Sequence, residues 1–299
     1  MSEAAIEETP GAGRNRLAMA AASYAGFGPA VLLLGGFFVV PLGIILLYSF
    51  WEVVNYNVVH HWTVGNYTYF FSVSTYVSTM FSTLWVSVVS TAIVIALAFP
   101  FSYWLSRYVS RRLRPLLLVL VVVPFWTSYL LRVYSWLTIL GEKGVLNRFL
   151  QWSGITNHPI GLFLYDRPAV ILVLVYLYFP FAALTLYASI ERFDWEQLRA
   201  AMDLGATPMT ALRKILIPQV RPGIVTAVIF VFIPILGEYL TPQIIGGTGG
   251  VMIGNLVVNF FQAAEFTRGA AVSLLIAAFI LLMLIIFRRS LSAPEAYGG

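Results

Sequence analysis

Six apolar runs, each long enough to cross a lipid bilayer, constrain the fold of this chain more than any other feature. They cover about residues 27–50, 80–105, 115–140, 168–190, 222–245 and 269–287. A helix rises about 1.5 Å per residue, so about 20 residues cross a hydrocarbon core of about 30 Å. Apolar residues make up 60% of the 299 residues and charged residues only 10%, which excludes an ordinary soluble domain. We therefore predict an all-α integral membrane protein with six transmembrane helices.

The positions of Lys and Arg predict the orientation of these helices. Thirteen of the 18 basic residues lie in the termini and the even-numbered loops, whereas four lie in the opposite loops. The positive-inside rule places the first group in the cytoplasm. We expect a flexible cytoplasmic N-terminus at 1–22, a membrane domain at 23–290 and a cytoplasmic tail at 291–299. The net charge of +5 is spread over short loops between spans, so we expect no nucleic-acid partner.

The loop at 191–222 is polar and carries the signals of two short helices. Asp194 suits the N-cap of the first helix, and Gly205 suits the left-handed residue that ends it. Pro208 suits the first position of a second helix, and Pro218 is expected to stop that helix. The sequence predicts a compact cytoplasmic helix-turn-helix between the fourth and fifth spans.

This loop resembles the cytoplasmic motif of ABC importer permeases, which reads EAA, three residues, GA, five residues, F, two residues, I, one residue, LP. The corresponding positions are Arg199, Ala200, Ala201, Gly205, Ala206, Leu212, Ile215, Ile217 and Pro218. Arg199 stands where the family usually has Glu, and the effect of that replacement is left open. In the family this loop docks into a groove of the ATPase subunit. The resemblance implies that these residues couple the chain to a separate ATPase.

Three further segments resemble permeases of the spermidine/putrescine type: 62–67 (WTVGNY), 124–147 and 252–257 (MIGNLV). The resemblance implies a type I ABC importer permease fold in a bacterial inner membrane, with both termini cytoplasmic. It also implies a second permease subunit, usually in a heterodimer, two ATPase subunits that use ATP and Mg²⁺, and a periplasmic solute-binding protein. The implied substrate is spermidine, putrescine or a similar small cation. Another small amine, an amino-acid derivative or an opine is the alternative.

Two ionisable residues fall inside apolar runs, where a charge is costly. Arg132 and Glu238 lie at similar depths in the outer half of the membrane, so an ion pair between them is possible. One interpretation is a neutralising pair, or an Arg132 side chain that reaches outward to the interface. The other is that Glu238 meets a cationic substrate.

Aromatic residues lie at helical spacing on the third and fourth runs. Tyr129 and Trp136 belong to the third run and Tyr176 to the fourth, and Tyr239 directly follows Glu238. Such stripes are typical of packing or lipid contact, but they also suit a lining whose ring faces attract organic ammonium groups. Together with Arg132 and Glu238, they are our candidates for the substrate path.

Five prolines fall within or near the middle of apolar runs, at positions 41, 100, 124, 180 and 234. Either they are simply common in such helices, or they mark kinked helices that surround a midplane cavity.

The sequence offers no catalytic constellation. It has no cysteine and no phosphate-binding loop, and His60, His61 and His158 lack clustered metal-ligand partners. We expect no enzyme activity, no metal and no cofactor on this chain, with ATP hydrolysis on another polypeptide. The alternative from another class is a stand-alone secondary transporter or channel that uses Arg132 and Glu238 as a relay.

Overall fold

The computed structural model of this chain describes residues 12–55, 57–158 and 164–291. In chain order the elements are α1 (Ala12–Ser49), β1 (Glu52–Val54), β2 (Asn57–Val59), α2 (Gly65–Ser72), α3 (Ser74–Tyr108), α4 (Arg114–Val122), η1 (Val123–Trp126), α5 (Tyr129–Leu140), α6 (Val145–Trp152), α7 (Arg167–Glu191), α8 (Trp195–Asp203), α9 (Pro208–Ala211), η3 (Leu212–Leu216), α10 (Ile217–Gln219), α11 (Arg221–Leu236), α12 (Leu240–Ile245), α13 (Ile253–Gln262) and α14 (Phe266–Leu291). The strands form one antiparallel hairpin, in which Val53 pairs with Val58.

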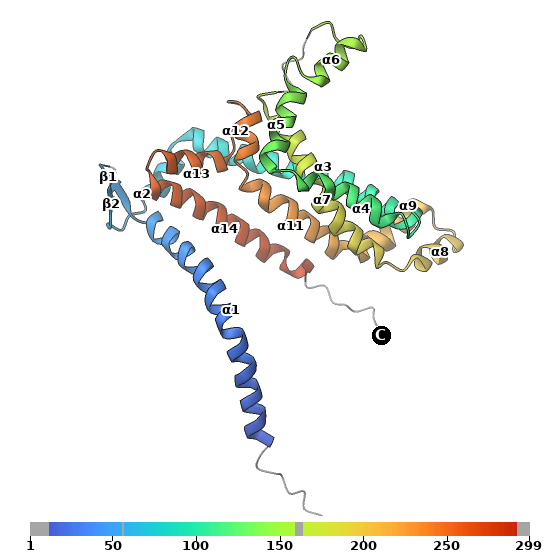
Figure 1. Cartoon of the computed structure of the whole chain (residues 1–299), viewed down its shortest axis with the longest axis horizontal. Helices are drawn as coiled ribbons and strands as arrows, with labels where there is room; N and C mark the ends of the chain where they lie inside the picture. The colour runs from blue at the N-terminus through green and yellow to red at the C-terminus, as the bar shows by residue number, and fades with distance from the viewer. Residues whose placement is uncertain (1–11, 56, 159–163, 292–299) are drawn as a thin grey trace, which may run out of the picture.

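The long helices α3, α7, α11 and α14 lie lengthwise in one bundle (Figure 1). At one end of the bundle are α8 and α9, and at the other are the hairpin, α2 and α13. Helix α1 contacts α14 but extends away from the other helices, and α6 projects from the opposite side. The two ends of the bundle therefore present different structures.

Four described helices are long and apolar enough to cross a membrane: Val31–Ser49 within α1, α3, α7 and Phe266–Arg288 within α14. Two bent helix pairs raise the number to six if each pair counts as one span. The first, Arg114–Trp126 with Tyr129–Trp152, bends by 90°. The second, Pro208–Gln219 with Arg221–Leu236, bends by 70°.

Helix α7 is the centre of the molecule. Just over half of its apolar window is buried inside the chain, whereas none of the window in α1 is buried. Small residues of both helices, Ala182 and Ala183 of α7 and Ala98 of α3, belong to the main apolar core. Because small side chains let helix backbones approach closely, they suit helix packing inside a membrane. The interface of α3 and α7 runs along the bundle and connects its two ends.

The prediction of one continuous third span over 115–140 is wrong. Helix α4 ends at Val122, and the backbone is extended at Thr127 and Ser128 before α5 begins. Pro124 lies in this bend, and its missing N–H cannot continue the hydrogen-bond ladder.

The predicted fifth span, 222–245, is also interrupted. Helix α11 begins as expected, with Pro222 in its first turn, but it ends at Leu236. Helix α12 begins only at Leu240, and Glu238 lies in the break between the two helices.

Both terminal helices extend into the segments that we expected to be tails. Helix α1 begins at Ala12, within the segment expected to be flexible, and α14 continues to Leu291. Residues 1–11 and 292–299, which hold the rest of the two expected tails, lie outside the described residues.

Candidate functional site

The loop between α7 and α11 begins with the helix pair that the sequence predicted. The N–H of Glu196 donates to Asp194 Oδ1 at 3.0 Å, which caps α8. Gly205 follows α8 with a φ of +91°, in the left-handed region. Thr207 then caps α9 by accepting from the N–H of Thr210 at 3.3 Å. The predicted cap, glycine turn and restart are all confirmed.

The expected stop at Pro218 is wrong. Helix α9 continues through a π-helical turn, η3, into α10, which contains Pro218. The direction changes two residues later, at Val220, where the 70° bend into α11 occurs. Pro218 lacks a backbone N–H and donates to no helical bond, and the N–H of the preceding Ile217 bonds to the Leu212 carbonyl oxygen across the π turn. The side chain of Gln219 donates to Gln197 Oε1 at 2.6 Å and ties α10 to α8.

The motif residues divide between the inside and the outside of this loop. Leu212 and Ile215 pack on the main core, and Ala201 and Ala206 are half-buried. Arg199, Ala200, Gly205 and Pro218 are exposed.

The most exposed large apolar side chain of the loop is Leu204, at 90%, which no sequence argument had singled out. The available signal was its position, directly before the glycine turn. An isolated Leu at the tip of a turn contributes nothing to the core of the chain itself. It suits contact with another protein.

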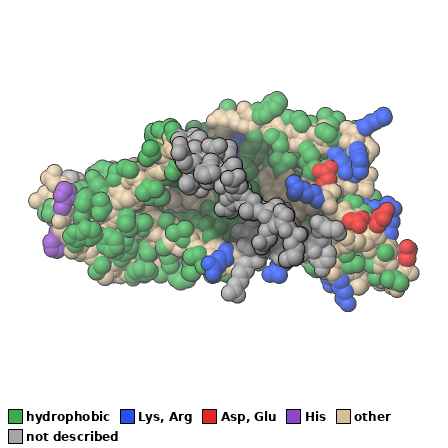
Figure 2. All heavy atoms as spheres, turned by 90° about the horizontal axis from the view of Figure 1, so that it is seen from below, with side chains coloured by type: hydrophobic (Ala, Val, Ile, Leu, Met, Phe, Trp, Pro, Cys, Tyr) green, Lys and Arg blue, Asp and Glu red, His purple; other side chains and the backbone are tan. Residues whose placement is uncertain are grey.

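The opposite ends of the bundle also differ in charge. Lys, Arg, Asp and Glu side chains gather at the end that carries α8, whereas the visible His side chains lie at the other end (Figure 2). The gathering of Lys and Arg at one end is what the positive-inside rule expects of the two sides of a membrane.

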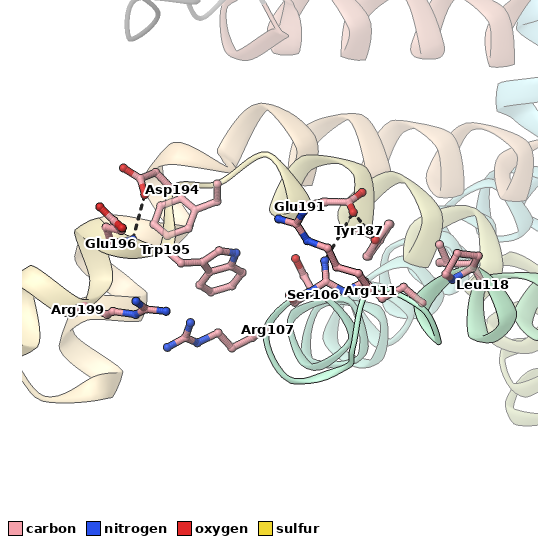
Figure 3. A pocket seen from close by; sticks show the side chains of 13 residues that line it. Ser106, Arg107, Arg111, Leu118, Tyr187, Glu191, Asp194, Trp195, Glu196 and Arg199 are labelled. Atoms are coloured by element: carbon pink, nitrogen blue, oxygen red, sulfur yellow. Dashed lines mark hydrogen bonds and ion pairs between the residues drawn. The ribbon is translucent and has the colours of Figure 1, made fainter.

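Trp195, the first residue of α8, anchors this helix to the end of α3. Its ring lies 5.7 Å from the Tyr103 ring and 5.3 Å from the Phe193 ring, centroid to centroid. The guanidinium of Arg107 lies 5.2 Å from the Trp195 ring, within the range of a cation–π contact. A hollow of about 960 Å³ opens beside these residues, between α3, α4, α7 and α8 (Figure 3).

Arg114 and Glu191 form the inner wall of this hollow. Arg114 donates to the carbonyl oxygens of Val109 and Ser106 at 3.0 and 2.7 Å, and lies 3.7 Å from Glu191 Oε1. The same Glu191 oxygen accepts from the Tyr187 hydroxyl at 2.6 Å. These contacts fix the short basic turn after α3 against the end of α7.

Glu238 lies within a network of hydrogen bonds. Its side chain is only 8% exposed. One oxygen accepts from the N–H groups of Leu240 and Thr241 at 3.0 and 3.3 Å. The other accepts from the hydroxyls of Tyr129 and Tyr178 at 2.7 and 3.3 Å. The carboxylate thus caps α12 and joins it to α5 and α7.

Arg132 and Glu238 do not form the ion pair that their depths permitted. The Arg132 guanidinium lies 4.3 Å from the Phe125 ring and 5.6 Å from the Tyr129 ring. Its Nε is buried and has no hydrogen-bond partner among the described residues. The structure therefore places Arg132 next to Tyr129 of the Glu238 network, but on ring faces.

The other candidates lie around the same junction of α5, α7 and α12. The rings of Trp136 and Tyr176 meet edge to face, with centroids 5.3 Å apart. Both line an apolar hollow of about 400 Å³, together with Phe125 and Phe179. Tyr239 is 42% exposed. Sequence reasoning missed Tyr178 and Thr241, because no local pattern shows that their hydroxyl groups meet at Glu238 and Tyr129.

A bundle of apolar helices that holds a polar helix-turn-helix between two of its spans defines a multi-pass membrane transport component. Residues 98–293 match the family described as the binding-protein-dependent transport system inner membrane component. This match covers well over half of the chain, which therefore belongs to that family. The expected permease class and inner-membrane setting are confirmed.

Curated relatives share part of the chain. The spermidine/putrescine transport system permease protein PotB of Salmonella typhimurium strain LT2 is 40% identical over 183 residues, covering 61% of this chain and 63% of that protein. PotB of Escherichia coli K12 is 38% identical over 183 residues, covering 61% and 66%. The inner membrane ABC transporter permease protein YdcU of the same strain is 31% identical over 204 residues, covering 64% of each chain. The matches thus span less than two thirds of the length of these relatives.

Two solved structures share the fold at low identity. A chain of a bacterial alginate ABC transporter, solved with an alginate pentasaccharide-bound periplasmic protein, matches with a TM-score of 0.70 and 17% identity, covering 93% of this chain and 98% of that chain. A bacterial ABC transporter involved in alginate import matches with a TM-score of 0.73 and 16% identity, covering 94% and 99%. These likenesses confirm the permease fold that the sequence predicted.

Proposed function

We propose that this chain is a permease subunit of an ABC importer for a small organic cation of the polyamine type. The loop at 191–222 would couple it to a separate ATPase. The observation that carries the proposal is the construction of this loop: a capped α8, a left-handed Gly205 and an exposed Leu204. Such a projection has no use within the chain itself, and it suits the groove of a partner protein.

The connections of the loop support a mechanical role. Helix α8 contacts α3 through Trp195 and is tied to α10 through Gln197, and α7 and α11 pack on each other. Closure of an ATPase dimer would move α8, and these contacts would carry the movement to the spans. The chain itself would hydrolyse nothing, and ATP with Mg²⁺ would be used by the partner.

The proposed substrate class rests on the named relatives and on the aromatic hollow. Two of these relatives are named as spermidine/putrescine permeases. The ring faces of Trp136 and Tyr176 suit ammonium groups, and the apolar wall suits the methylene chain between them. Because four donors already hold the Glu238 carboxylate, we assign the first substrate contacts to the rings.

The proposed assembly contains this chain, a second permease subunit, two ATPase subunits and a periplasmic solute-binding protein. Both termini of this chain and α8 would face the cytoplasm. The exposed apolar face of α1, including Leu32 and Phe37, needs lipid or another membrane subunit to cover it.

Uptake by the purified assembly in vesicles tests the proposal. We expect ATP-dependent uptake of labelled putrescine or spermidine that requires the ATPase and the binding protein. Gradient-driven uptake by this chain alone would instead favour a stand-alone transporter. ATP-dependent uptake of another solute, with no competition from polyamines, would keep the permease role and reject the substrate class.

A further inference from the structure

Two arginines from different elements converge on the hollow beside Trp195. Arg107 comes from the last turn of α3, and Arg199 comes from α8. Figure 3 shows their guanidinium groups pointing toward one another below the Trp195 ring. Among the described residues, neither group forms an ion pair or a hydrogen bond, and Arg107 lies over the Trp195 ring.

The acidic side chains that line the hollow do not lie between the two arginines. Glu191 is bonded to Tyr187 and lies beside Arg114. Asp194 caps α8, and both Asp194 and Glu196 point to the other side of the helix in Figure 3. Arg107 and Arg199 therefore face each other without a carboxylate from the described chain between them.

Two converging cations repel one another, and the repulsion is relieved when an anion binds between them. Arg107 is half-buried and held over Trp195, so little side-chain freedom would be lost when it binds. A carboxylate fits the planar donor groups of guanidinium, and such charge-assisted bonds are stronger than neutral ones. The arrangement has the features of a preorganised anion site.

We propose that Arg107 and Arg199 together receive a carboxylate side chain of the ATPase subunit. This proposal rests on the proposed function, because it concerns the partner that docks at 191–222. Arg199 shares α8 with the exposed Ala200 and with Leu204, which lies at its end, so an anion at this site would belong to the protein that covers that surface. The ATPase partner is therefore expected to carry Asp or Glu at its docking edge. A permease with an acidic residue at position 199 would not suit this ATPase.

Carbodiimide cross-linking of the complete transporter tests the contact directly, since this reagent joins an amine to a carboxylate without a spacer. The variant Arg107→Lys/Arg199→Lys supplies the amines and retains both charges. We expect a new cross-linked peptide between position 107 or 199 and an acidic residue of the ATPase. Arg112→Lys is the matched control, because Arg112 is exposed in the basic turn between α3 and α4 and does not line the hollow. Equal or no cross-linking to the ATPase in the two variants would overturn the proposal.

The affinity of the ATPase for the permease gives a second, independent measurement. Arg199→Glu is expected to weaken binding at least about tenfold, as for the loss of one member of an interfacial charge pair. Arg199→Lys should retain most of the affinity, and Arg112→Glu, which makes the same charge change, should have little effect. The difference should shrink at high salt.

The outcomes separate this proposal from the proposed function. If the wild-type chain binds no ATPase at all, the proposed function fails. If it binds an ATPase and Arg199→Glu binds equally well, only the carboxylate contact fails. If mass spectrometry of the intact complex instead finds an anionic phospholipid that is lost from Arg107→Gln/Arg199→Gln, with ATPase affinity unchanged, the site belongs to a lipid phosphate and the proposal is overturned.

Discussion

Glu238 shows why a charge inside an apolar run is not by itself a substrate site. The sequence places the carboxylate at membrane depth, but the structure surrounds it with donors from three helices, α5, α7 and α12. Tyr129 gives its single hydroxyl hydrogen to Glu238, so Thr241 donates to Tyr129 at 2.7 Å in turn. The first N–H groups of a helix have no carbonyl acceptor within the helix, and the carboxylate supplies that acceptor for α12. Its first role is to hold the broken fifth span.

Replacement of Glu238 should separate this role from substrate binding. In Glu238→Gln the amide oxygen can still accept from Leu240 and Thr241, so we expect a loss of about 1 kcal/mol of stability. Glu238→Ala removes the acceptor of the Leu240 and Thr241 N–H groups and of the half-buried Tyr178 hydroxyl, whereas Tyr129 keeps its bond to Thr241. This loss should cost about 3 kcal/mol and lower Tm in detergent. Tyr239→Phe, at the next position, is the control for Tm alone, because Tyr239 is itself a candidate for the substrate path. If Glu238→Gln abolishes uptake while Tm is unchanged, the carboxylate contacts the substrate.

Gly205 tests the turn of the loop at 191–222, for which we propose the name coupling loop. A Cβ at this position would meet no atom within 4 Å, so the strain of the left-handed backbone is the only cost of Gly205→Ala. That cost is about 1 kcal/mol and should appear as a lower Tm and weaker ATPase binding. Gly43→Ala, in the helical α1 and equally unobstructed, should be neutral or slightly stabilising. Equal effects of the two substitutions would show that the left-handed turn is dispensable.

At the scale of helices, α7 and α11 approach closely just above the coupling loop. A Cβ on Gly223 of α11 would overlap Cβ and Oγ of Ser189 on α7. We expect Gly223→Ala to destabilise the chain by about 1–3 kcal/mol, because a packed interface has no room for the methyl group. Ser189→Gly should relieve the overlap.

A double-mutant cycle measures this contact. Tm and ATPase-coupled uptake should be closer to wild type in Ser189→Gly/Gly223→Ala than in Gly223→Ala alone. Additive losses in the double variant would mean that Ser189 and Gly223 are not energetically coupled, and the proposed close contact of α7 and α11 would be rejected.

The elements that were predicted correctly are those whose signal is local. A cap, a glycine turn and an uninterrupted apolar run each depend on neighbouring residues, so α3, α7 and the start of α8 follow from the sequence. The break before α5 was missed because Pro41, Pro100, Pro180 and Pro234 lie inside continuous helices, whereas Pro124 lies beside a 90° bend. The break at Glu238 contains no proline. Whether a proline kinks or breaks a helix depends on partners supplied by other helices.

The site candidates show the same division between local and distant information. Depth along each run placed Arg132 and Glu238 at the same level, and in the structure both contact Tyr129, which helical spacing had singled out. Depth does not say which groups face one another. The hydroxyls of Tyr178 and Thr241 were therefore missed, and the sequence did not decide whether Arg132 pairs with Glu238. The convergence of Arg107 and Arg199 joins residues 92 positions apart and has no local signature at all.

For the whole molecule, the orientation in the membrane remains a prediction that the shape makes testable. The chain has no native cysteine, so single cysteines report accessibility without a background. Leu204→Cys lies at the tip of the charged end and His61→Cys at the exposed end near the hairpin. The positive-inside rule predicts that these positions lie on opposite sides of the membrane.

An impermeant maleimide should therefore label His61→Cys in intact spheroplasts, but label Leu204→Cys only after the membrane is opened. Addition of the ATPase to opened membranes should then slow the labelling of Leu204→Cys, because docking buries the tip of the loop, and should leave His61→Cys unchanged. Labelling of Leu204→Cys from outside would reverse the topology and remove the coupling loop from the reach of any cytoplasmic ATPase. Unchanged labelling on addition of the ATPase would keep the topology but place the docking surface elsewhere on the charged end.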